Sequence, residues 1–210
     1  MSTEKRDFDK EAGAWDENPR RVKLVKDVAG AIARQIALRS DWDVMEFGCG
    51  TGLLSLQIHP HVHSITGIDS SQGMLDQFDR KIAQLKLDQV KTVLFDLDQG
   101  HALPGKYDLV ISNMTLHHIE QIEPLLAQLH NALVPGGQLC VSDLDPDEGR
   151  FHEDNTGVFH FGFDRTTLRN TATAAGFEDV MVTDAAEMVK PGADGKMGRF
   201  SVFLMTGRKR

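Results

Sequence analysis

The stretch Val44-Met45-Glu46-Phe47-Gly48-Cys49-Gly50-Thr51-Gly52 decides the fold of this chain. It begins as an apolar strand, passes through a carboxylate and ends in glycines at every second position, after which Leu53 starts a helical pattern. Glycine lacks a Cβ atom, so its backbone adopts positive φ and lets a ligand approach the main chain closely. The helix N-terminus adds unpaired N–H groups. This stretch predicts a ligand-binding strand-to-helix turn, and a tight turn without a ligand is the alternative.

The chain beyond this turn alternates strand and helix patterns, which predicts an α/β fold with a doubly wound, Rossmann-like sheet that is mostly parallel. The last two strand patterns, near 178–183 and 199–206, have only a turn-rich connector between them, so we expect them to pair antiparallel. The other predicted strands lie near 43–47, 64–69, 90–95, 107–113 and 138–144, and the helices near 52–58, 71–85, 122–133 and 166–175.

Two helical patterns precede the sheet, one from Phe8 to Trp15 and one near 20–38. Trp15 is a candidate lid over a ligand, and plain packing is its alternative. The basic residues Arg20-Arg21-Lys23-Lys26 are interpreted as a solvated helix face. We expect a single domain over 1–210, in which 1–38 forms a helical lid, 39–145 binds the cofactor, and 146–210 supplies a substrate wall, a helix and the terminal hairpin.

Composition narrows the class of protein. Lys and Arg number 23 against 31 Asp and Glu, and the net charge of −8 disfavours a long nucleic-acid surface. No apolar run approaches a membrane span, and Met1 to Lys10 is too polar for a signal peptide. A cytoplasmic location is therefore expected, with Cys49 and Cys140 reduced and unpaired.

Polar residues end four consecutive predicted strands, and the carboxyl ends of parallel strands share one edge where ligands bind. Asp69 is placed to accept both hydroxyls of a ribose, or to cap the helix that follows. Asp96 is placed to accept a hydrogen bond from the exocyclic amine of a purine, and the Leu97 N–H is placed to donate to a ring nitrogen. The alternative for Asp96 is an aspartate that only stabilises a turn. Glu46 disfavours a pyrophosphate and favours a ligand that carries an ammonium group. The fourth strand ends at Asn113.

These features together resemble the class I S-adenosylmethionine-dependent methyltransferases. The resemblance implies a seven-stranded sheet and S-adenosylmethionine as the cofactor, with Gly48, Gly50 and Gly52 passing its methionine part and Asp69 and Asp96 holding its nucleoside. It also implies cofactor contacts from Glu46, Cys49, Ser70, Met74, Leu97 and Asn113. The matching stretches are Glu46 to Gly52, Ile68-Asp69, Phe95-Asp96-Leu97, Asn113 to Ile119, and Pro135-Gly136-Gly137.

The N-terminal stretch from Phe8 to Asp16 is similar to the lid helix of small-molecule members, such as the methyltransferases of quinone biosynthesis. The expected reaction is an in-line methyl transfer to a small-molecule acceptor, which depends chiefly on alignment and removal of water. If the acceptor must lose a proton, His117 and His118 are the candidate bases. Packing or helix capping is the alternative for each histidine.

The segment from Phe151 to Arg165 alternates aromatic residues with histidines, so we expect a wall over the acceptor that includes His160 and Phe161. Asp164 is expected to cap the next helix. A metal set of His152, Glu153, His160 and Asp164 matches no familiar zinc spacing, so we expect no metal.

Two other functions stay open at this point. A nicotinamide-dependent oxidoreductase shares the glycine turn and the ribose acid, although the terminal hairpin, Glu46 and the site at Asp96 and Leu97 argue against it. A non-catalytic protein that binds S-adenosylmethionine is also compatible, because cofactor motifs report binding rather than turnover.

Overall fold

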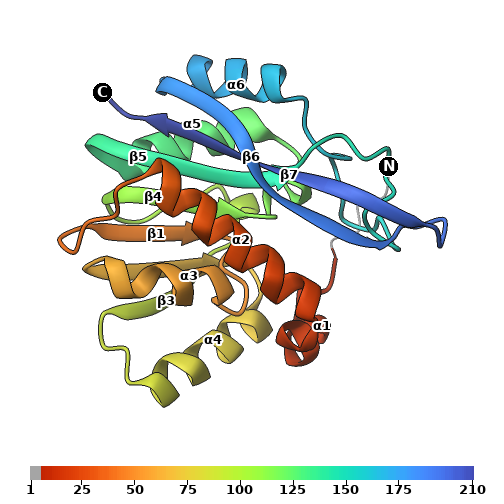
Figure 1. Ribbon diagram of the computed structural model, residues 1–210. Helices are drawn as coiled ribbons and strands as arrows, with labels where there is room; N and C mark the ends of the chain where they lie inside the picture. Colours follow the sequence, from red (N-terminus) through yellow and green to blue (C-terminus); the bar gives the residue numbers. More distant parts are fainter. Residues whose placement is uncertain (1–5) are drawn as a thin grey trace.

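Seven strands form one sheet in the order β3-β2-β1-β4-β5-β7-β6, with helices on both faces (Figure 1). The computed structural model describes residues 6–210, so the first five residues of the predicted lid lie outside the described part. The strands are β1 (Asp43–Phe47), β2 (Ser64–Asp69), β3 (Val90–Leu94), β4 (Tyr107–Asn113), β5 (Leu133–Leu144), β6 (Glu178–Pro191) and β7 (Met197–Arg208). The helices are α1 (Phe8–Glu11), α2 (Pro19–Gln35), α3 (Leu53–Ile58), α4 (Gln72–Leu85), α5 (Ile122–Ala132) and α6 (Arg165–Ala174), with short 3-10 turns η1 (Ala12–Glu17), η2 (His59–His61), η3 (Leu97–Gln99) and η4 (Leu116–His118).

The pairing confirms the predicted fold class. Strands β1 to β5 pair in parallel, whereas β7 runs antiparallel between β5 and β6. Strand order reverses at β1, which has β2 on one side and β4 on the other. In open α/β sheets a ligand binds outside the carboxyl ends of the strands at such a reversal, which places the predicted glycine turn at the expected site.

Three strands are longer than the sequence pattern predicts. Strand β5 begins at Leu133, because Leu133 pairs with Tyr107 of β4 across an irregularity in register. Strands β6 and β7 pair as far as Pro191 and Met197, so the predicted connector narrows to a short turn. Strands pair through their backbones and need no particular side chains for it. The polar outer part of this hairpin therefore lacks the apolar alternation from which a strand is predicted.

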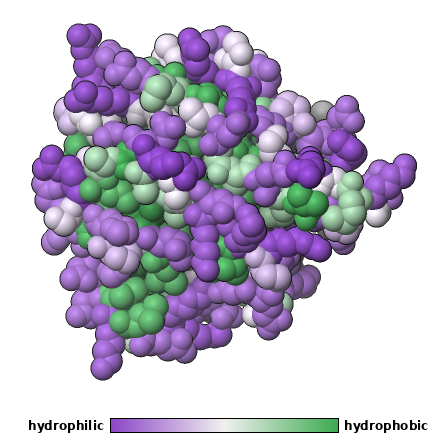
Figure 2. All heavy atoms as spheres, in the orientation of Figure 1, coloured by the Kyte–Doolittle hydropathy of each residue, from purple (hydrophilic) through white to green (hydrophobic). Residues whose placement is uncertain are grey.

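Each face of the sheet carries its own apolar core. Helices α2, α3 and α4 pack on one face and α5 and α6 on the other. Figure 1 shows α2 running across the front of the sheet, and Figure 2 shows hydrophilic side chains over most of that side of the molecule. The inward stripe of α2 consists of Leu24, Val25, Val28, Ala31 and Ile32.

The glycine turn has the conformation that its sequence predicts. Gly48, Gly50 and Gly52 all have positive φ, at 71°, 52° and 79°. A Cβ atom on Gly52 would lie 2.2 Å from Cδ2 of Phe78, whose ring is fully buried. Gly52 therefore serves the packing of α4 against the turn rather than a ligand.

The substitution Gly52→Ala is expected to destabilise the protein by about 3 kcal/mol, because it adds a steric clash to an unfavourable φ. Gly50→Ala is the matched control, since its Cβ would meet only Met74 Sδ at 4.0 Å, and we expect a loss of about 1 kcal/mol from backbone strain. Urea unfolding of the two variants measures the difference. Equal stabilities would show that the contact with Phe78 relaxes at no cost.

Candidate active site

One cavity of about 830 Å³ lies at the carboxyl ends of β1, β2 and β4, in the upper part of the range typical of small-molecule sites. It brings together most of the side chains predicted for the site. Those on its wall are Trp15, Glu46, Gly48, Cys49, Gly50, Asp69, Ser70, Met74, Asp96, Leu97, Asn113, His117 and His118.

Three predicted residues do not line the cavity. Gly52 lies beneath the ring of Phe78. His160 packs on Phe163, with its Nε2 atom 2.9 Å from the Ile119 carbonyl oxygen, and Phe161 is 49% exposed. His160 and Phe161, expected in the wall over the acceptor, thus lie outside this cavity. Phe151, His152 and Phe159 from the same segment line the cavity instead.

Asp69 organises the cofactor end of the cavity. Its Oδ2 accepts from the Gly50 N–H at 2.7 Å and its Oδ1 from the Ser71 N–H at 2.9 Å. The N-cap of α4 is Ser71 rather than Asp69, so the capping alternative for Asp69 is wrong. Burial raises the pKa of Asp69 even though backbone N–H bonds oppose it. The Asp69 oxygens can still accept hydrogen bonds from a ligand. Gly50 beside them has almost no side-chain neighbours, so a ligand can approach its backbone.

The next strand adds an acid and apolar walls. The Asp96 side chain accepts from the Asp98 N–H at 3.1 Å and caps the 3-10 turn η3. Leu97 and the buried Met74 also line the cavity. A flat ring between Met74 and Leu97 with Asp96 at its edge fits an adenine, so the residues present suit the nucleoside that the sequence predicts.

Glu46 is 2% exposed, and its Oε2 accepts a hydrogen bond from the Ser55 hydroxyl. Burial raises the pKa of Glu46 to about 8, and the charge of Asp69 adds to the rise. A carboxyl group that lines the cavity and stays protonated at neutral pH ionises when a cation arrives. Glu46 therefore suits a ligand ammonium group.

This pKa predicts a pH dependence of stability. The folded state holds the Glu46 proton up to a pH of about 8, whereas the unfolded chain releases it near the usual pKa of a glutamate. The contribution of protonated Glu46 to the free energy of unfolding is therefore complete below that usual pKa and is lost as the pH rises toward 8. The wild type is expected to lose about 1 kcal/mol per pH unit relative to Glu46→Gln between roughly pH 5 and 8. Urea unfolding of both proteins across this window measures it. Parallel curves would contradict the raised pKa.

The N-terminal segment is docked against the cofactor end. Asp9 Oδ1 accepts from the Ser71 hydroxyl at 2.5 Å and from the Gly73 N–H at 2.8 Å. Asp16 accepts from the Thr51 hydroxyl at 2.6 Å and pairs with Lys81. Trp15 lines the cavity, with the Arg21 guanidinium 3.7 Å from its ring centroid. The segment predicted as a lid thus contacts the glycine turn and the start of α4.

The opposite end of the cavity carries His117, which is 1% exposed and bonded to a buried acid. Its Nδ1 lies 2.7 Å from Oδ1 of Asp143, whose side chain is fully buried. A carboxylate only accepts, so Nδ1 carries the proton and Nε2 presents its lone pair. Asp143 also accepts from the backbone N–H of Leu144 at 2.7 Å. This arrangement holds the His117 ring in one tautomer and one orientation.

Two further histidines surround His117. His152 Nε2 lies 3.1 Å from His117 Nε2, and Arg6 donates to His152 Nδ1 at 3.1 Å, so His152 donates to His117. His118 Nδ1 donates to the Gly157 carbonyl at 2.7 Å and leaves its own Nε2 as an acceptor. Burial lowers the pKa of His118 to about 3 and that of His152 to about 2, and the positive charge of neighbouring groups contributes. Both rings are neutral at physiological pH.

Within residues 6–210, His117, His118 and His152 form a group whose ligand atoms lie within 4.8 Å of one another and could hold a metal ion. His117 and His152 bond to each other through their Nε2 atoms, and Arg6 donates to Nδ1 of His152. The metal set considered from the sequence is not assembled, because His160 bonds to Ile119 and Asp164 caps α6.

Sequence reasoning missed Asp143 and misjudged the start of α2. Asp143 lies near the end of β5, so the argument from strand ends that found Asp69 and Asn113 applies equally to it. Lys23 and Lys26 are exposed, as the solvated-face interpretation predicts, whereas Arg20, also exposed, and the half-buried Arg21 line the cavity as well.

Comparison with known proteins decides the family. Residues 45–139 match the model of a methyltransferase domain. An uncharacterized methyltransferase of Schizosaccharomyces pombe is 30% identical over 71% of this chain and 58% of its own length. The chain contains a domain of the S-adenosylmethionine-dependent methyltransferase family. The family confirms the predicted cofactor and argues against the nicotinamide-dependent alternative.

Other similar proteins agree with this family. A ubiquinone biosynthesis O-methyltransferase of Pseudomonas aeruginosa is 28% identical over 62% of this chain and 53% of its own. The structure of phosphoethanolamine N-methyltransferase 2 of Haemonchus contortus with S-adenosyl-L-methionine superposes with a TM-score of 0.70 at 16% identity, covering 86% of this methyltransferase and 52% of that chain. This methyltransferase spans about half the length of the curated relatives it matches. In its described part, no helix is both long and apolar enough to cross a membrane.

Proposed function

We propose that this methyltransferase catalyses transfer of the methyl group of S-adenosylmethionine to a small-molecule acceptor beside His117. One observation carries the proposal: a single cavity is lined both by Asp69 and the glycine turn and by His117, which the buried Asp143 holds from behind. The bound cofactor supplies an electrophilic methyl group. This chain's residues supply position, exclusion of water and a place for a proton.

In this proposal the cofactor residues divide by chemistry. Asp69 accepts from the ribose hydroxyls, Asp96 and the Leu97 N–H bind the adenine edge, and Glu46 binds the ammonium group. The other predicted contacts are Gly48, Cys49, Gly50, Ser70, Met74 and Asn113, all of which line the cavity. Asn113 is held by a hydrogen bond of 2.9 Å from the Ser142 hydroxyl to its Oδ1.

His117 is the better placed of the two predicted bases. A proton taken up at its Nε2 produces an imidazolium whose Nδ1–H faces the Asp143 carboxylate, and the opposite charge stabilises it. For this step His152 must turn away from His117 Nε2, because it donates to that atom in the structure. His118, with its pKa lowered to about 3, is the weaker base, and its Nε2 serves to accept a hydrogen bond.

Several observations support a small acceptor. The cavity has the size typical of sites for small molecules, and the net charge of −8 does not suit a nucleic-acid partner. The ubiquinone biosynthesis and phosphoethanolamine methyltransferases among the similar proteins are named for small molecules. The cytoplasmic location and the division into lid, core and substrate wall stay predictions.

The first test is calorimetric titration with S-adenosylmethionine, S-adenosylhomocysteine and NADH in parallel. Binding of the first two alone is expected, and binding of NADH alone would contradict the proposal. A screen of small acceptors for methyl uptake follows. Cofactor binding without transfer to any acceptor would favour the non-catalytic alternative.

A further inference from the structure

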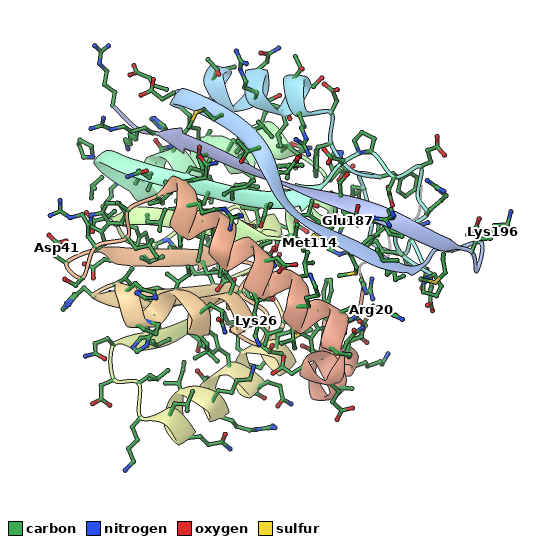
Figure 3. The ribbon with its side chains drawn as sticks, in the orientation of Figure 1. Arg20, Lys26, Asp41, Met114, Glu187 and Lys196 are labelled. Atoms are coloured by element: carbon green, nitrogen blue, oxygen red, sulfur yellow. The ribbon has the colours of Figure 1, made fainter. Side chains whose placement is uncertain are left out.

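Four cationic side chains gather on one part of the cavity wall although the chain as a whole carries a net charge of −8. Arg6 comes from the segment before α1, Arg20 and Arg21 from the first turn of α2, and Lys190 from the end of β6. Figure 3 shows Arg20 at the N-terminal end of α2, beside α1. Segments far apart in sequence thus bring like charges together.

Two of these cations have carboxylate partners. Arg6 forms a bidentate pair with Glu11, with N–O distances of 2.6 and 2.9 Å. Arg21 lies 3.7 Å from the same Glu11 and stacks on Trp15. One carboxylate therefore serves both arginines and leaves the group positive.

The other two cations have no carboxylate within salt-bridge distance among residues 6–210. The side chain of Arg20 is exposed, and its described hydrogen bond comes from its backbone N–H. Lys190 is half-buried; its ammonium group donates to the Phe151 carbonyl and lies 4.2 Å from the centroid of the Phe151 ring. Burial and then the charges of Arg20, Arg21 and Arg6 lower the pKa of Lys190, against the opposing effect of Glu153.

Like charges that converge on a cavity repel one another and raise the free energy of the empty site, and an anion relieves this repulsion. The acids on this part of the wall, Glu153 and Asp154, are exposed. Apolar groups lie between the cations and the histidines: Phe8 packs on His118 with ring centroids 5.1 Å apart, and Phe151 packs on His152 at 4.9 Å.

We propose that the methyl acceptor is a small anion, with an apolar body and a carboxylate or phosphate group bound by Lys190, Arg20 and Arg21. This inference rests on the proposed function, because it places the reacting atom of the acceptor beside His117. Lys190 contacts Phe151, and the next residue, His152, contacts His117. Lys190 and His117 therefore both lie beside the Phe151–His152 segment, so an acid group bound at Lys190 is near an atom that reacts at His117.

The test uses a matched pair of probes, 4-hydroxybenzoate and the uncharged 4-hydroxybenzamide, titrated calorimetrically into the protein saturated with S-adenosylhomocysteine. Wild type is expected to bind the acid at least about tenfold more tightly than the amide. Arg20→Gln should weaken the acid about fivefold and leave the amide unchanged. Lys190→Met should weaken the acid about tenfold. Lys26→Gln on the same helix is the control, because Lys26 is exposed and outside the cavity.

Equal binding of acid and amide to wild type would overturn the proposal, as would a preference for the acid that survives both cavity substitutions. Failure of both probes to bind up to about 10 mM would overturn it too, since the site is then no anion site. A separate titration with S-adenosylhomocysteine alone distinguishes the two levels of inference. If the cofactor binds but the acid is not preferred over the amide, only the proposal of an anionic acceptor is contradicted. If the cofactor does not bind, the proposed function itself is contradicted.

Discussion

Asp69→Ala is expected to weaken the binding of S-adenosylhomocysteine by more than roughly tenfold, because the ribose hydroxyls lose their acceptors. A second effect adds to the first. The Gly50 and Ser71 N–H groups, now 2.7 and 2.9 Å from the Asp69 oxygens, lose their partner, and the glycine turn loses one of its contacts with the end of β2. Calorimetric titration of the folded variant measures the loss.

The control for this prediction is Asp76→Ala. Asp76 is an exposed carboxylate on α4 that accepts from Gln72 at 2.8 Å and does not line the cavity. Its removal changes the net charge by the same amount, and we expect unchanged affinity. Unchanged affinity in a folded Asp69→Ala variant would remove the ribose role, and circular dichroism establishes the folding.

Asp143→Asn is expected to lower the turnover number by roughly 100-fold, because the protonated His117 ring no longer faces a negative charge. His117→Gln should lower it by at least as much, since no acceptor for the proton remains. Cofactor affinity should change little, because Asp143 is buried outside the cavity and neither residue is assigned a cofactor contact. Initial rates with an acceptor found in the screen, together with calorimetry, separate the two effects.

His160→Gln is the matched histidine control. His160 lies outside the cavity and bonds to the Ile119 carbonyl, so we expect nearly wild-type turnover. Full activity of His117→Gln would show that the acceptor needs no base, and the role of His117 would then be packing. Asp143→Asn that folds and turns over normally would remove the assigned function of the buried pair.

The two sets of predictions address opposite ends of one cavity. Asp69 governs whether the cofactor binds, whereas His117 and Asp143 govern what happens after it binds. The cations at Arg20 and Lys190 bear on which acceptor enters. Because no hydrogen bond or ion pair joins the three groups in the described part of the chain, we expect their substitutions to act separately on affinity, turnover and specificity.

The sequence by itself determined the fold class and the cofactor end of the site. Alternation of apolar strands with amphipathic helices is a local pattern, and it predicted the bounds of β1, β2 and β4 as the structure has them. Asp69 and Asp96 were predictable for a related reason, because the carboxyl ends of neighbouring parallel strands must meet at one edge. The glycine turn adds a backbone conformation that few other residues adopt.

Only the tertiary structure decided the acceptor end. Asp143 meets His117 across 26 residues of sequence, and Lys190 meets Phe151 across 39. Neither meeting has a periodic signature, because it depends on the register of β5 and β6 and on the path of the segment after β5. The same path turned His160 and Phe161 away and brought His152 in. Long-range contacts of this kind follow from how the elements pack, and packing is a property of the whole chain rather than of any one stretch.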